Sequence, residues 1–157
     1  ALPASLDDAK AENELGEIQR LLVLWDPDGR IRELQALIAA WFSGPEKEKL
    51  VRERLDRAEY ALTHDLPRAI DKRDVVWAAD LRHLILNEII RALYYRNNRF
   101  LRRLKGVDLE VETFAIKPRG FVRKIREAAS VGAGDAIRSL RDLLEETRNC
   151  PQGSPAS

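Results

Sequence analysis

Hydrophobic positions recur at helical spacing along most of the chain. From residue 31 to 42 the apolar side chains fall three or four positions apart, and Gly44-Pro45 ends that run. A second helical pattern starts at Pro45 and continues to about residue 64, where Asp65 and Pro67 predict a break or a kink. Further helices are predicted over residues 75–103, 118–130 and 135–148, and a polar helix is predicted from Ser5 to about residue 20.

Residues 21–25 interrupt this pattern with the apolar run LLVLW, which the turn signal DPDG follows. Five apolar residues ended by a turn fit either a buried strand or the end of a helix. Residues 107–117 are predicted to form a loop with a short extended piece. The whole pattern predicts an all-α bundle of five or six helices, with one short strand or helix end near residues 21–25.

The predicted domain organisation follows from the same turn signals and from where the helical pattern begins and ends. Residues 27–149 form the helical bundle domain, and residues 1–26 form an N-terminal segment that fits the remnant of a preceding domain. Residues 150–157 are predicted to be a disordered tail.

Composition narrows the classes of function. The chain has 157 residues, and 27 Lys and Arg against 26 Asp and Glu give a formal net charge of +1, so nucleic acid is not indicated as a partner by charge. One cysteine, Cys150, excludes an internal disulfide and a multi-cysteine metal site. No apolar run is long enough to span a membrane, and the first residues lack the pattern of a signal peptide, so we expect a soluble, cytoplasmic protein.

A polar stripe runs along the long helix predicted at 75–103, opposite a broad apolar arc that would make this helix the centre of the bundle. Its side chains have directional hydrogen-bonding groups, which suit a ligand; the alternative is the solvated face of an amphipathic helix. The cationic end of the stripe fits either a phosphate-facing patch or compensation of the helix dipole. The predicted substrate-binding residues are Asp80, His83, Asn87, Arg91, Tyr94 and Asn98, with Arg96 and Arg99 at the end.

Three short motifs resemble the nucleotidyltransferase superfamily. They are WDPDGRIREL at residues 25–34, ALYYRNNRF at 92–100 and KPRGFV at 117–122. In order and spacing they are similar to the helical C-terminal domain of kanamycin nucleotidyltransferase and related aminoglycoside-modifying enzymes, over residues 21–148. The resemblance implies a substrate-binding helical domain that supplies walls for a small-molecule acceptor. Such domains sometimes supply a carboxylate base; Asp80 lies on the stripe, whereas Glu88 lies about 80–100° away from it.

The catalytic half of that superfamily is missing from the chain. It carries a Gly-Ser followed about a dozen residues later by paired acidic residues that bind magnesium, and this sequence has no such motif. The chain therefore contains no predicted catalytic residue or metal ligand, and Mg²⁺ and a nucleoside triphosphate are implied only for a missing catalytic domain. The expected partner is that catalytic domain or subunit, or a second copy of the chain paired through residues 21–25.

Two other classes of function stay open. Ribonucleases of the HEPN class use an Arg and a His a few residues apart in a small helical bundle, and Arg57 and His64 meet the loosest form of that spacing. The third class is a non-enzymatic interaction module that binds another protein through residues 21–25.

Overall fold

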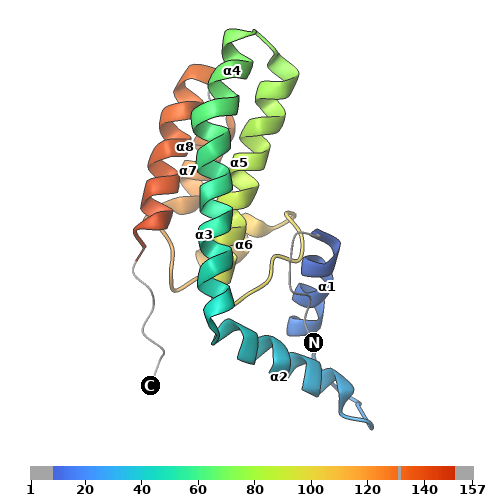
Figure 1. Cartoon of the computed structure of the whole chain (residues 1–157). Helices are drawn as coiled ribbons and strands as arrows, with labels where there is room; N and C mark the ends of the chain where they lie inside the picture. Colours follow the sequence, from blue (N-terminus) through green and yellow to red (C-terminus); the bar gives the residue numbers. More distant parts are fainter. Residues whose placement is uncertain (1–8, 131, 151–157) are drawn as a thin grey trace.

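The computed structural model describes residues 9–130 and 132–150, and within them the protein is all-α, as predicted. The expected helix start at Ser5 and the expected tail at 151–157 lie outside the described residues. The elements are α1 (Ala9–Arg20), α2 (Arg30–Phe42), α3 (Pro45–Tyr60), the π-helix η1 (Ala61–Asp65), α4 (Leu66–Asp71), α5 (Val75–Arg96), α6 (Val107–Glu112), α7 (Phe121–Ser130) and α8 (Ala133–Arg148) (Figure 1).

Helix α5 packs antiparallel to α3 (Figure 1). Helix α8 packs against both α3 and α5, and α7 packs against α8 and α5. The broad apolar arc predicted for α5 is buried, which confirms its central position. From residue 89 to 95 every side chain of α5 is buried, because the neighbouring helices and loops surround that half of it. The buried arc consists of Leu81, Ile85, Leu86, Ile89, Ile90 and Leu93, and Phe100 continues it beyond the helix.

The expected break near Asp65 does not occur, because α3, η1 and α4 follow one another without interruption. Pro67 has no backbone N–H to donate, and in an α-helix its ring would press on the carbonyl of Thr63. The wider π turn directly before it relieves that contact, and the N–H of Leu66 donates to the carbonyl of Ala61, five residues back. When these three elements are counted as one continuous helix, the described residues form seven helices, one more than the five or six predicted.

Helix α5 ends at Arg96, earlier than the predicted 103, because Asn98 adopts a left-handed conformation with φ of 55°. The N–H of Arg99 donates to the carbonyl of Tyr94, and the N–H of Asn98 donates to Tyr95, so a left-handed residue closes the helix. The prediction of a loop at 107–117 was also wrong in part, because α6 forms there after Gly106, which has a left-handed conformation.

Helices α1 and α2 lie at one end of the bundle, and α2 extends away from it (Figure 1). Helix α1 packs against the segment that follows α5, where a Cβ on Gly16 would stand 3.1 Å from the carbonyl oxygen of Phe100. A side chain at this position would push the two backbones apart by a few tenths of an ångström, so glycine suits the close approach. Only Ile38 and Phe42 of α2 are fully buried, so the first two turns of this helix are held mainly by Gln35, whose side-chain amide donates to the carbonyls of Ile18 and Leu21 at 3.0 Å.

Candidate functional site

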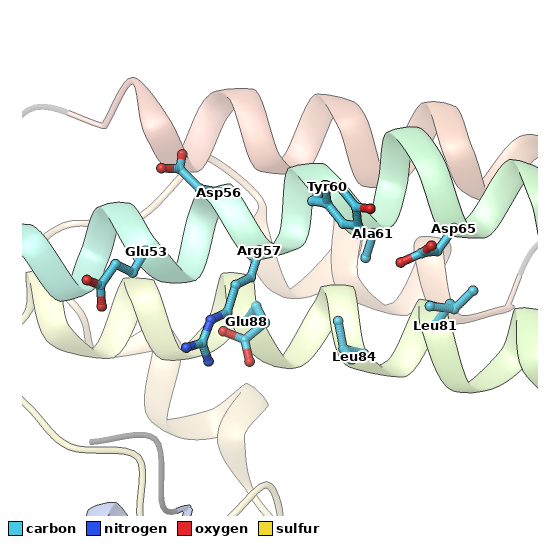
Figure 2. A pocket seen from close by; sticks show the side chains of 9 residues that line it. All are labelled: Glu53, Asp56, Arg57, Tyr60, Ala61, Asp65, Leu81, Leu84 and Glu88. Carbon is cyan, nitrogen blue, oxygen red and sulfur yellow. The ribbon is translucent and has the colours of Figure 1, made fainter. Parts of the chain in front are cut away.

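A groove of about 550 Å³ that could hold a small molecule lies between α3 and α5, shown in Figure 2. Its apolar part comes from Leu81 and Leu84 of α5 and from the small side chain of Ala61 in η1. Tyr60 stands at the rim, 60% exposed, and its ring stacks on His64 with centroids 4.6 Å apart. The lining residues are Glu53, Asp56, Arg57, Tyr60, Ala61, Asp65, Leu81, Leu84 and Glu88.

Charge in the groove is mainly negative, because four carboxylates and one guanidinium line it. Glu88 lies 3.3 Å from Arg54, and its side chain is only 12% exposed. Asp56 accepts from Arg148 of α8 at 3.0 Å, and in Figure 2 it points away from α5. These two pairs neutralise Glu88 and Asp56, so the preference of the groove for a ligand with positive charge next to an apolar body rests on Glu53 and Asp65.

The predicted stripe does not form one accessible face. Asp80 and His83 are exposed near the start of α5, and Asn87 is half-buried. His83 and Asn87 line a separate, smaller hollow of about 230 Å³, which α6 and α7 close from the other side. The structure therefore brings these two residues together but leaves Asp80 outside the hollow.

Arg91 and Tyr94, the middle of the stripe, lie in the interior. Arg91 is buried and pairs with the carboxylate of Glu12 from α1. Tyr94 is fully buried with its ring edge-on to Phe114, and burial raises the pKa of its hydroxyl well above the usual value. The sequence pattern placed both residues on the polar side of the helix, but Glu12 of α1 lies against Arg91, and Arg20 and Phe114, which follows α6, lie against the ring of Tyr94.

The last three members of the stripe hold other parts of the chain. Arg96 donates to the carbonyls of Arg148 at 2.9 Å and Cys150 at 2.8 Å, which satisfies the end of α8. Asn98 accepts from Lys47 through its side chain and from Gln19 through its backbone carbonyl. Arg99 lies 3.3 Å from Glu110, and its guanidinium covers the ring of Phe114. Each of these contacts joins two segments of the chain, so they have a structural role.

Arg57 and His64 take different positions with respect to the groove. Arg57 lines it and points from α3 toward α5, whereas His64 is exposed beyond Tyr60 and is not among the lining residues. The Nδ1 atom of His64 lies 2.8 Å from the hydroxyl of Thr63 and 3.2 Å from the carbonyl oxygen of Tyr60. This ring therefore already has local hydrogen-bond partners, and the pair does not converge on one hollow.

Residues 21–25 form an exposed apolar segment between α1 and α2. The segment is irregular, so neither a strand nor a helix end describes it. Leu22, Leu24 and Trp25 are 83%, 86% and 80% exposed. Leu34 and Leu37 of α2 add further exposed apolar surface nearby in the chain. Isolated exposed leucines are ordinary, but a run of them on one projecting arm is a candidate interaction surface.

Sequence reasoning missed most of the groove. Glu53, Asp56 and Tyr60 are spaced three and four residues apart on α3, which was a visible signal of a shared helix face. Glu88 was placed away from the expected site, and the structure puts it in the groove instead. The missing information was which face of α3 meets which face of α5.

Comparisons with known proteins return no relative: no protein-family model, curated protein or solved structure matches the chain. Among the residues that the structure describes, no group of three His, Cys, Asp or Glu side chains is arranged to hold a metal ion. No helix in the described ranges combines the length and hydropathy that crossing a bilayer requires.

Proposed function

We propose that the chain is the substrate-binding helical part of a nucleotidyltransferase-type enzyme and docks on the catalytic part through residues 21–25. The observation that carries this proposal is the exposed apolar segment itself. Among the described residues, Leu22 to Trp25 form no backbone–backbone hydrogen bond, and three of these four side chains are almost fully exposed. A segment with free N–H and C=O groups and apolar side chains is suited to pair with the edge of a partner's sheet.

The acceptor is proposed to bind in the groove between α3 and α5. The stripe is a poorer candidate because Arg91 and Tyr94 are buried, whereas the groove is open and has an apolar side next to carboxylates. Glu88 and Asp56 are paired with Arg54 and Arg148, so Glu53 and Asp65 are the carboxylates proposed to favour an acceptor with an amino group, such as an aminoglycoside-like molecule. Within the described ranges no group of acidic side chains is arranged to hold a metal ion, so the proposed nucleotide transfer relies on the catalytic part.

The proposal is tested by recovering the complete enzyme from native cells. The tagged chain is expressed there, and the bound material is characterised by intact mass and by transfer of a nucleoside monophosphate from a nucleoside triphosphate with Mg²⁺. We expect a polypeptide with the Gly-Ser and paired-acid motif, either as a separate subunit or joined to this chain. The double variant Leu22→Asp/Leu24→Asp should lose a separate subunit, because two charges would enter the apolar contact.

Val75→Asp/Val76→Asp is the matched control, because these two valines are 79% and 74% exposed at the far end of the bundle. Both double variants should keep the native helix content, and the control should keep the partner. Recovery of the chain alone, without the motif and without transferase activity, would refute the proposal. If that lone chain self-associates through Leu22 and Leu24, the non-enzymatic interaction module becomes the better description.

A further inference from the structure

Two buried arginines face each other between α3 and α5. Arg54 of α3 is 5% exposed and Arg91 of α5 is 7% exposed. One carboxylate, that of Glu12, lies between them: its Oε2 atom pairs with Arg91 and stands 3.7 Å from Arg54. The Tyr95 ring is fully buried in the same place, and the charges of both arginines affect the pKa of its hydroxyl.

We propose that Arg54 and Arg91 form a binding site for a monoanionic carboxylate, which Glu12 of α1 occupies as an internal ligand. Arginine binds carboxylates best through two parallel N–H···O bonds that use both oxygens. Glu12 uses its Oε2 atom for both arginines, while its Oε1 atom is buried and has no hydrogen-bond partner among the described residues. A free carboxylate that engages both oxygens can therefore compete with Glu12.

The charges at the site select the class of ligand. Arg54 and Arg91 contribute two positive charges, and Glu88, 3.3 Å from Arg54, contributes one negative charge. One further negative charge gives a neutral cluster, and this is the charge that Glu12 supplies. A phosphate dianion would leave one excess negative charge in a desolvated place, so the site favours a carboxylate over a phosphate.

The way α1 is held makes exchange feasible. Leu15 is the only buried large apolar side chain of α1 in the described part of that helix. The other attachments of α1 are the half-buried side chain of Ile18, the part-buried pair of Arg20 with Glu110, and polar contacts nearer the surface, namely Gln19 with the backbone of Asn98 and Phe100 and Glu17 with Arg102. The surface contacts are weakened by water and salt, so the buried Glu12 carboxylate is the strongest polar attachment of the helix.

The test removes the internal ligand and supplies a free one. In the Glu12→Ala variant, thermal unfolding is followed by circular dichroism while sodium acetate is added at constant ionic strength with sodium chloride. We expect a lowered Tm that rises saturably with acetate, by about 4 °C at ten times its Kd. Inorganic phosphate at pH 8 should give no more than the chloride effect, which distinguishes a carboxylate site from a general anion site.

Glu17→Ala is the matched control on the same helix, because Glu17 forms an exposed pair with Arg102. Its Tm should respond to acetate far less than that of Glu12→Ala, because Glu12 still occupies the site, and Glu12→Ala/Arg91→Met should show no response beyond that of chloride. An acetate effect equal to that of chloride, or one that persists without Arg91, would overturn the proposal. If Glu12→Ala does not fold, hydrogen exchange of residues 13–20 in the native chain decides: faster exchange in acetate than in chloride supports the site, and equal rates refute it. These results do not depend on a catalytic partner, so this proposal and the proposed function can fail separately.

Discussion

Arg54 and Arg91 are stable in the interior only because carboxylates from two other positions neutralise them. Burying a charge costs several kcal/mol, and a well-placed partner compensates most of that cost. Removal of one partner from such a pair typically destabilises a protein by about 3–5 kcal/mol, whereas apolar replacement of the whole pair is often neutral. The cluster therefore fixes which residues of α1, α3 and α5 face one another more than it adds to stability.

We expect the buried hydroxyls of Tyr94 and Tyr95 to make the protein less stable at alkaline pH. Burial raises the pKa of both hydroxyls above the ordinary value of 10.0, so the unfolded chain releases these protons first. Their contribution is complete below pH 10 and is lost as the pH rises from 10 toward the folded pKa values. The free energy of unfolding, measured in urea, should fall there by up to about 1.4 kcal/mol per pH unit for each tyrosine.

The phenylalanine variants give the control for this pH dependence. Tyr94→Phe and Tyr95→Phe should each reduce the slope above pH 10, because each removes one of the titrating groups. An unchanged slope in the double variant would mean that other groups cause the alkaline unfolding.

At the scale of helices and turns, the start of α5 depends on one side chain. Asp74 has an extended backbone, and its Oδ1 atom accepts from the N–H of Trp77 at 2.9 Å. Asp74→Ala should lower the free energy of unfolding by about 1 kcal/mol, because an N–H at the helix start loses its partner. Asp74→Asn keeps an acceptor and should cost much less. Equal losses in the two variants, measured by urea unfolding, would contradict a capping role.

Helix content was predictable from the sequence because one face of each long helix is apolar. The buried arc of α5 followed directly from residues spaced three and four apart. The end of α5 was not predictable from the sequence, because Asn97 and Asn98 are polar residues that a helix can also contain. The helix ends here because Asn98 adopts a left-handed conformation. Asn97 fixes that end through bonds to Ile116, which lies nineteen residues away and is invisible to local patterns. The π turn before Pro67 likewise reflects relief of a steric contact in an otherwise helical sequence.

At the scale of the whole molecule, the site was predictable only in part. Periodicity tells which residues share a face of one helix, but the groove needs two faces from α3 and α5 at a particular register. The same limitation explains Arg91 and Tyr94. Their helix face was identified from the sequence, but the segments that cover it lie about eighty residues before Arg91 and about twenty after Tyr94.

The projecting part of α2 predicts uneven stability across the molecule. Its first two turns bury no side chain fully and are attached mainly through the hydrogen bonds of Gln35, and an isolated helix of this length is marginal in water. In native-state hydrogen exchange, amides of residues 33–37 should open with a free energy near zero, whereas those of residues 89–93 should approach the global value. Equal protection of the two segments would show that the arm is held by contacts along its whole length. Partner docking should raise the protection of the arm alone.

The attachment of α1 also has a consequence for synthesis of the chain. Arg20 contacts Glu110, ninety residues later, and Glu12 contacts Arg91, seventy-nine residues later. At about 5–20 residues per second, a ribosome needs roughly 5–18 s to make the ninety residues from Arg20 to Glu110. During that interval the nascent α1 has no docking surface, and the apolar residues that follow it are exposed as well. A chaperone that binds short apolar segments would find its target in residues 21–25 well before the bundle closes.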